Sequence, residues 1–151
     1  MEEAVQLDRI DLKILAELQK SSRISMAVLG KKVGLSKSPV LTRVRRLERD
    51  GYIEGYTARL NTTKLGLTQV AFVQVTLDKT TTEALDAFNS AAGAVREIEE
   101  CHMIAGGFDY LLKVRARDMA AYRKALGETV ARLPHVAQTS TFMVMEAVKE
   151  A

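Results

Sequence analysis

Apolar residues recur at steps of three and four along the first part of the chain. The first such stripe covers residues 8–20 and predicts an amphipathic helix, because this spacing places side chains on one helical face. Its members are Leu7, Ile10, Ile14 and Leu18, with Leu12 and Leu15 widening it. Asp8 or Asp11 supplies negative charge near the start, where the helix dipole favours it.

Two further helices are predicted after a break at residues 21–23. Ser25 is the expected N-cap of the first, which ends at Gly34 and carries Val28, Leu29 and Val33. Ser36 is the expected N-cap of the next, which runs to about Asp50 and stops at Gly51. Two short helices joined by a glycine-containing turn form a helix-turn-helix pattern.

From Leu67 the apolar period changes to two, which predicts strands. Expected strands cover residues 67–77, 95–105, 110–116 and 136–148. One helix begins with a capping box, Thr80 and Glu83, and ends near Gly93; another begins at Asp118 and continues until Pro134. Gly106 and Gly107 mark a hairpin between the second and third strands.

The resulting order is strand, helix, strand, strand, helix, strand, which is the split βαβ or ferredoxin-like arrangement. The predicted fold class is therefore α+β. A helix-turn-helix domain with a connector strand is expected over residues 1–60, and a ferredoxin-like domain over residues 61–151. Both helices of the second domain should cover one sheet face, while Val70 and Phe72 put apolar residues on the other. Such a face favours homodimerisation.

Charge is distributed unevenly along the chain. The net charge of +3 hides a segment, residues 20–59, with ten Lys and Arg against three Asp and Glu. A positive patch of this density is typical of proteins that bind a polyanion.

The third helix places this charge opposite its apolar stripe of Val40, Val44 and Leu47. The arginines between positions 43 and 49 are expected to project outward, towards a major groove. The residues expected to contact DNA are Lys31, Lys32, Ser36, Lys37, Ser38, Thr42, Arg43, Arg45, Arg46 and Arg49. Lys37 and Ser38, at the start of the helix, are the expected base contacts, since Ser can bond base edges. Double-stranded DNA is thus the predicted partner.

Other classes of function find little support. The longest uncharged runs, residues 65–77 and 133–145, contain 13 residues each and fall short of a bilayer span. The N-terminal residues do not form a secretory signal, so a cytoplasmic location is expected. One Cys and two His cannot form a metal cluster, and no catalytic constellation or cofactor site is predicted.

The chain resembles the Lrp/AsnC family of leucine-responsive and asparagine-linked regulators over nearly its whole length. The matching segments are LDRIDLKIL (7–15), GLSKSPV (34–40), RVRRL (43–47), GYIEG (51–55), Leu65 with Gly66, and GGFDY (106–110). The resemblance implies a winged-type helix-turn-helix joined to a ferredoxin-like ligand-sensing domain. It also implies regulation by a small amino acid and homodimers that assemble into octamers.

The resemblance further implies an effector site between dimers. Gly106, Gly107, Phe108 and Asp109 would line it, with glycine N–H groups near a carboxylate and Asp109 accepting from an α-ammonium. Gln138, Thr139 and Ser140 would add neutral hydrogen bonds from a neighbouring chain. The residues alone leave a simpler interpretation open, in which these are a hairpin turn and an edge strand.

Three alternatives to a sequence-specific regulator remain. An architectural protein that wraps DNA with modest sequence preference fits the same charge pattern. An RNA-binding protein shares the split βαβ topology, but would need aromatic rows on its central strands, and the chain has only eight Phe and Tyr. An enzyme on this scaffold would need a catalytic constellation that the sequence does not contain.

Overall fold

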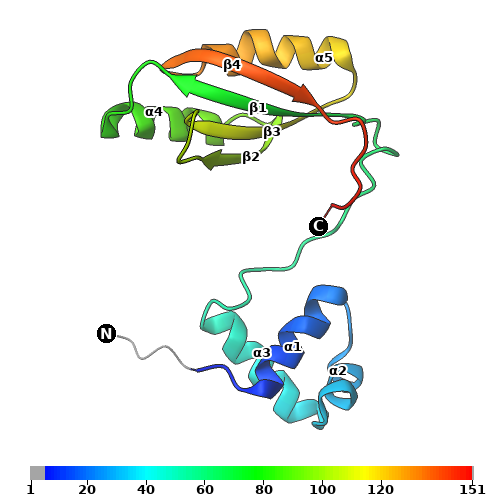
Figure 1. Cartoon of the computed structure of the whole chain (residues 1–151). Helices are drawn as coiled ribbons and strands as arrows, with labels where there is room; N and C mark the ends of the chain where they lie inside the picture. Colours follow the sequence, from blue (N-terminus) through cyan, green and yellow to red (C-terminus); the bar gives the residue numbers. More distant parts are fainter. Residues whose placement is uncertain (1–5, 151) are drawn as a thin grey trace. The chain divides into compact units, whose positions relative to one another are not determined.

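The computed structural model describes residues 6–150. Contacts divide the chain after Arg59 into two compact units, a helical unit and a sheet unit, each of which we describe by itself. Figure 1 shows helices alone in the first unit and a sheet with its helices in the second. No helix among the described residues combines the length and apolar character that crossing a bilayer requires.

The helical unit begins with α1 (Arg9–Lys20), which the apolar stripe correctly predicted. Asp8 is its N-cap and forms a capping box with Asp11: each carboxylate accepts a hydrogen bond from the other residue's backbone N–H, at 2.8 and 3.1 Å. Ile14 and Leu18 are buried against the core of this unit.

Helices α2 (Met26–Val33) and α3 (Lys37–Arg49) form the expected helix-turn-helix. Gly34 adopts the left-handed conformation that ends α2, with φ of 80°. Gly30 lies so close to the next turn that a Cβ there would stand 2.5 Å from the Leu35 carbonyl oxygen. The sharp turn between α2 and α3 therefore depends on two glycines.

The connector strand expected within residues 1–60 does not form within the single chain over the residues that the structure describes. After Gly51, residues 54–61 adopt neither helix nor strand. A strand requires hydrogen bonds to a neighbouring strand, and the described part of the helical unit supplies none.

The sheet unit has the element order expected for the split βαβ fold. In sequence these elements are β1 (Gln69–Leu77), α4 (Thr82–Gly93), β2 (Ile98–Met103), β3 (Tyr110–Ala116), α5 (Met119–Lys124) and β4 (Val136–Met143). The strands lie in the order β2-β3-β1-β4, and every neighbouring pair is antiparallel (Figure 1).

Both helices cover the same face of this sheet. Val73 of β1 and Leu112 of β3 are cross-strand partners, and both are fully buried. They share one core with Phe88 of α4 and Tyr122 of α5. The opposite face, which we call the open face, carries Val70, Phe72, Lys113, Arg115 and Phe142.

Several element boundaries differ from the sequence-based expectation. The N-cap of α4 is Thr81 rather than Thr80, because the Thr81 hydroxyl accepts the Ala84 N–H at 3.3 Å. β2 begins at Ile98 rather than residue 95, since the chain turns after α4. β4 ends at Met143 rather than residue 148: Val144 keeps one hydrogen bond, to the Val70 carbonyl, and the residues after it are not in a strand. The helix from Asp118 changes to a π turn over Ala125–Thr129 and a 3-10 turn over Val130–Arg132.

Candidate DNA-binding and effector sites

The outer face of α3 is exposed and cationic. Val40, Val44 and Leu47 are buried, as the sequence predicted. Eight of the ten residues expected to contact DNA are exposed: Lys31, Lys32, Ser36, Lys37, Ser38, Thr42, Arg45 and Arg49. A helix about 10–12 Å across with such a face matches the width of a DNA major groove, about 12 Å.

The exposed cations differ in their partners. Within residues 6–150, Lys31, Lys37 and Arg45 form no ion pair, and are therefore available to an external anion. Arg49 pairs with the adjacent Asp50 at 2.9 Å, but its side chain is 73% exposed. Thr42 donates its hydroxyl hydrogen to the Ser38 carbonyl oxygen at 3.1 Å and keeps its oxygen lone pairs for another donor.

Arg43 and Arg46 do not project outward, and the expectation that all arginines of α3 do so is wrong. Arg43 Nη1 lies 2.6 Å from Asp8 Oδ2 and 2.8 Å from Asp11 Oδ1. Arg46 Nη2 lies 2.5 Å from Asp11 Oδ2. The two guanidinium groups are half-buried because they neutralise the Asp11 carboxylate, whose side chain is 1% exposed. We call Asp8, Asp11, Arg43 and Arg46 the α1–α3 clamp.

These contacts shift the ionisation of the acids in the clamp. Burial alone would raise the pKa of Asp11, but the Asp8 N–H and the two arginines together hold it below its ordinary value. The pKa of Asp8 is also lowered, chiefly by the Asp11 N–H and then by Arg43. Both carboxylates are therefore ionised at neutral pH.

Lys32 has an acidic partner as well. Its Nζ lies 2.6 Å from Glu17 Oε2 of α1, while Lys20 lies 2.9 Å from the other oxygen. Lys32 is 51% exposed, so solvent screens this pair and the lysine can exchange to another anion.

Sequence reasoning missed the clamp, although the sequence contained a signal for it. Asp11 follows Leu7 by four residues and precedes Ile14 by three, so it falls within the apolar stripe. An acid in that position must be paired to be tolerated. The arginines of α3 were the available partners.

The hairpin expected to contact an effector lies between β2 and β3. The backbone of Asp109 bonds to both sides, donating to the Val75 carbonyl at 2.9 Å and accepting from Ile104 N–H at 2.8 Å. Its Oδ2 accepts the Leu77 N–H at 2.7 Å. Gly106 and Gly107 are exposed and Phe108 is half-buried. Asp109 is thus held at the end of β1.

The other three expected effector residues do not share a face. Thr139 pairs with the buried Val75 and lies on the helix-covered side of β4. Gln138 and Ser140 pair with Thr76 and Gln74 and lie on the open face. β1 separates these residues from the hairpin, so the structure does not bring the seven side chains into one set.

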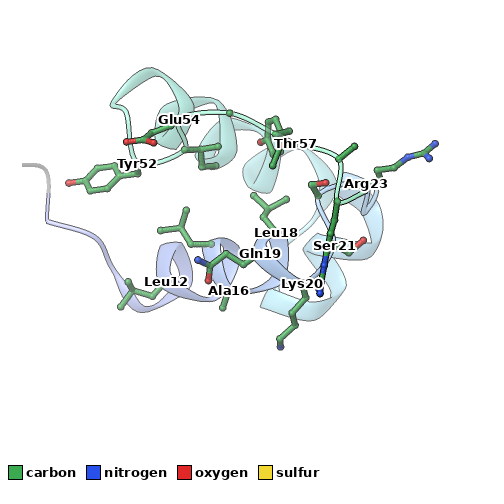
Figure 2. A pocket seen from close by; sticks show the side chains of 17 residues that line it. Leu12, Ala16, Leu18, Gln19, Lys20, Ser21, Arg23, Tyr52, Glu54 and Thr57 are labelled. Atoms are coloured by element: carbon green, nitrogen blue, oxygen red, sulfur yellow. The ribbon is translucent and has the colours of Figure 1, made fainter. Parts of the chain in front are cut away.

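Neither of the two cavities described for the chain contains an expected effector residue. The larger, about 1000 Å³, lies in the helical unit between α1 and residues 52–59. Figure 2 shows Leu12 and Gln19 on one side and Tyr52 and Thr57 on the other. Tyr56, which also lines it, donates its hydroxyl to Glu48 at 2.7 Å, and burial followed by this contact raises its pKa to about 12.

The second cavity, about 520 Å³, lies at the open face under residues 144–150, which we call the strap. The strap is held at one end by Val144 N–H, which donates to the Val70 carbonyl at 2.9 Å. At the other end Glu150 Oε1 accepts from Lys113 Nζ at 2.8 Å and Arg115 Nη2 at 2.9 Å. The outer part of this face remains apolar: Phe72 and Phe142 are cross-strand partners, 36% and 54% exposed.

Among residues 6–150, no group of three or more His, Cys, Asp or Glu side chains is arranged to hold a metal ion.

Comparisons with known proteins cover both units. The sheet unit matches the Lrp/AsnC ligand binding domain over residues 70–151, and the helical unit matches a winged helix-turn-helix DNA-binding domain over residues 7–54. The leucine-responsive regulatory protein of Klebsiella pneumoniae is 56% identical over 144 residues, which are 95% of this chain and 88% of that protein. The protein of the same name from Escherichia coli K12 is 55% identical over the same shares.

Solved structures agree with this similarity. A transcriptional regulator of Neisseria meningitidis in complex with L-Met superposes with a TM-score of 0.91 and 30% identity, over 96% of this chain and 94% of that chain. An AsnC family transcriptional regulator of Agrobacterium tumefaciens also gives a TM-score of 0.91, with 33% identity over 95% and 94% of the two chains.

Proposed function

Because this chain belongs to the Lrp/AsnC family of transcriptional regulators, we propose that it regulates transcription by binding specific DNA sequences through α3 and a small amino acid through its sheet unit. The observation that carries the DNA-binding part is the exposed cationic face of α3, which lies opposite its buried stripe. We propose that the protein acts in the cytoplasm and catalyses no reaction.

The exposed residues of α3 have the chemistry for both kinds of DNA contact. Ser38 and Thr42 are small polar side chains that can reach base edges, and Arg45 can bond guanine O6 and N7. Lys37 lies at the start of the helix, beside Ser38. Lys31 and Arg49 lie at the end of α2 and of α3, where phosphate contacts would fix the protein on the duplex.

The test is a binding titration of the full chain with duplex DNA over a range of salt concentrations. Affinity should fall steeply as salt rises, since phosphate contacts release counterions. Arg45→Ala should weaken binding while the far-UV circular dichroism stays that of the wild type. Binding that survives replacement of both Lys37 and Arg45 would place the interface elsewhere.

We propose that a free amino acid is the effector. The exposed Gly106 and Gly107 offer backbone N–H groups for a carboxylate, and Asp109 keeps its Oδ1 for an ammonium group while Oδ2 is engaged. The neutral groups of Gln138, Thr139 and Ser140 would come from a neighbouring copy, because β1 separates them from the hairpin within one chain.

We propose that the chain also self-associates. The Phe72 and Phe142 pair leaves the open face apolar, and a second copy would cover it, giving homodimers that assemble into octamers. A thermal-shift panel of amino acids tests the effector, because a ligand of the folded form raises the melting temperature. If no amino acid raises the melting temperature, and calorimetry also detects no binding, the proposal of an amino acid effector is contradicted.

An architectural DNA-wrapping role remains the second candidate, favoured by cations on both α2 and α3. The two roles differ in the ratio of specific to non-specific affinity, which should reach at least about 10³ for a sequence-specific regulator.

A further inference from the structure

The cations expected to contact DNA fall into two classes: those that pair with an acidic residue of α1 or its N-cap, and those that do not. Lys32, Arg43 and Arg46 are paired with Glu17, Asp8 or Asp11. Lys31, Lys37 and Arg45 form no ion pair within the described residues, and Arg49, whose side chain is 73% exposed, pairs only with its neighbour Asp50. The first helix therefore influences which charges the second and third helices present.

The acidic partners differ in how firmly they hold their cations. Glu17 pairs with lysines that are 51% and 70% exposed, so DNA phosphate could replace it. Asp11 is 1% exposed and bonds two guanidinium groups at 2.8 and 2.5 Å. Releasing these arginines would leave a buried carboxylate without its counter-charges, which is costly. Arg43 and Arg46 are therefore the cations least able to move to phosphate.

We propose that Asp11 is a positioning residue of the DNA-binding surface: it keeps Arg43 and Arg46 in intramolecular pairs, so that Lys37, Arg45 and Arg49 are the cations of α3 that reach the duplex. This inference rests on the proposed function. Non-specific binding comes from neutralising phosphates, whereas base reading comes from particular side chains at the groove. An acid that keeps two arginines in intramolecular pairs lowers non-specific affinity for phosphate and leaves the base contacts unchanged. The ratio of specific to non-specific affinity therefore increases.

The experiment measures the slope of log affinity against log salt for the full chain and a mixed-sequence duplex. Each lost phosphate contact should make the slope shallower by about 0.9. Arg45→Ala should show this change, whereas Arg43→Ala and Arg46→Ala should keep the wild-type slope. Asp11→Asn should bind the mixed-sequence duplex more tightly and with a steeper slope, because it removes the carboxylate charge that pairs with Arg46 and one of the two that pair with Arg43. A merely structural role for Asp11 would reduce the folded fraction and leave the slope unchanged.

Asp8→Asn provides a milder variant in case Asp11→Asn does not fold. Asn caps helices as well as Asp, and the Asp8 side chain is 49% exposed, so this variant should keep α1 intact. It should steepen the slope by a smaller amount, and the increase should vanish when Arg43 is replaced by Ala. Asp118→Asn is the matched control: Asp118 also caps a helix, accepting Ala121 N–H at 2.8 Å, but lies in the sheet unit.

The outcomes separate this inference from the function on which it rests. A wild-type chain that does not bind the duplex at low salt overturns the proposed function, and the inference with it. The inference alone is overturned if the wild-type chain binds the duplex but the salt slope of Arg43→Ala or Arg46→Ala is as shallow as that of Arg45→Ala. An equal effect of Asp8→Asn and Asp118→Asn would also overturn it, because net charge rather than the clamp would then explain the result.

Discussion

The side chain of Asp11 is 1% exposed and negatively charged, and three groups surround that charge. The Asp8 N–H and the guanidinium groups of Arg43 and Arg46 all donate to it. They compensate the desolvation of the carboxylate and fasten the start of α1 to the middle of α3. One residue thereby links the local capping of a helix to the packing of two helices.

Acid should destabilise the helical unit through this carboxylate. The folded-state pKa values of Asp8 and Asp11 lie below their ordinary value of 3.8, so their stabilisation is fully present above that value. It is lost as pH falls through the lowered folded-state pKa values. Urea denaturation followed by circular dichroism between pH 7 and pH 2 should show this loss.

Asp11→Asn should lower the free energy of unfolding at pH 7 by roughly 2 kcal/mol, the scale of hydrogen bonds to charged groups. It should also flatten the acid limb. An acid limb as steep as that of the wild type would mean that other carboxylates cause the acid sensitivity.

At the scale of elements, the turn between α2 and α3 depends on the absence of a side chain at Gly30. A Cβ there would stand 2.5 Å from the Leu35 carbonyl oxygen, which is backbone and cannot rotate away. Gly30→Ala should therefore lower the unfolding free energy of the helical unit by about 1–3 kcal/mol, the usual cost of overpacking. Gly55→Ala is the control, since nothing lies within 4 Å of its Cβ position. Equal denaturation midpoints for the two variants would contradict this account.

The start of α4 offers a second pair of matched variants. Thr81→Ala removes the hydroxyl that accepts the Ala84 N–H and should lower the unfolding free energy of the sheet unit by about 1 kcal/mol. Thr80→Ala removes the same atoms from the preceding residue and should have little effect. Guanidinium denaturation of the two proteins measures the difference. A larger loss of unfolding free energy in Thr80→Ala would show that Thr80, not Thr81, is the cap.

The same threonines show where sequence reasoning reached its limit. Apolar periodicity predicted the three helices of the helical unit and the order of helices and strands along the sheet unit, because burial enforces those patterns. It could not choose between Thr80 and Thr81, since adjacent threonines offer the same hydroxyl and backbone geometry decides. It also could not see that β4 ends at Met143, although β1 extends two residues further, because the length of a strand depends on its pairing and not on its own apolar pattern.

At the candidate sites, the sequence could not predict the directions in which some of the side chains point. The α3 face was predictable because 3.6 residues per turn fixes which positions oppose Val40 and Val44. The inward turn of Arg43 and Arg46 depends on acids over thirty residues earlier in the chain. Thr139 lies on the other face from Gln138 and Ser140 because successive residues of a strand alternate between its faces. The family resemblance grouped the three residues by their position in the sequence and did not take this alternation into account.

At the scale of the whole molecule, the open face of the sheet carries two phenyl rings, Phe72 and Phe142, that the helices leave uncovered. Phe142→Glu should weaken self-association at least tenfold, because it places a charge where a second copy would bury the phenyl ring. Sedimentation velocity at several concentrations measures this. Met119→Glu is the control, since Met119 is 48% exposed on α5, which packs on the other face. An unchanged oligomer in Phe142→Glu would show that copies meet elsewhere.

The alternation along β4 has a thermodynamic consequence. Gln138 and Ser140 point to the side of the sheet on which another subunit would lie, whereas Thr139 points to the helix-covered side. A small molecule held by these two side chains would share its surroundings with the contact between subunits. Linkage is reciprocal, so such a molecule would change subunit affinity by the same factor by which assembly changes its own binding. The binding of the small molecule would then depend on the concentration of the protein as well as on that of the small molecule.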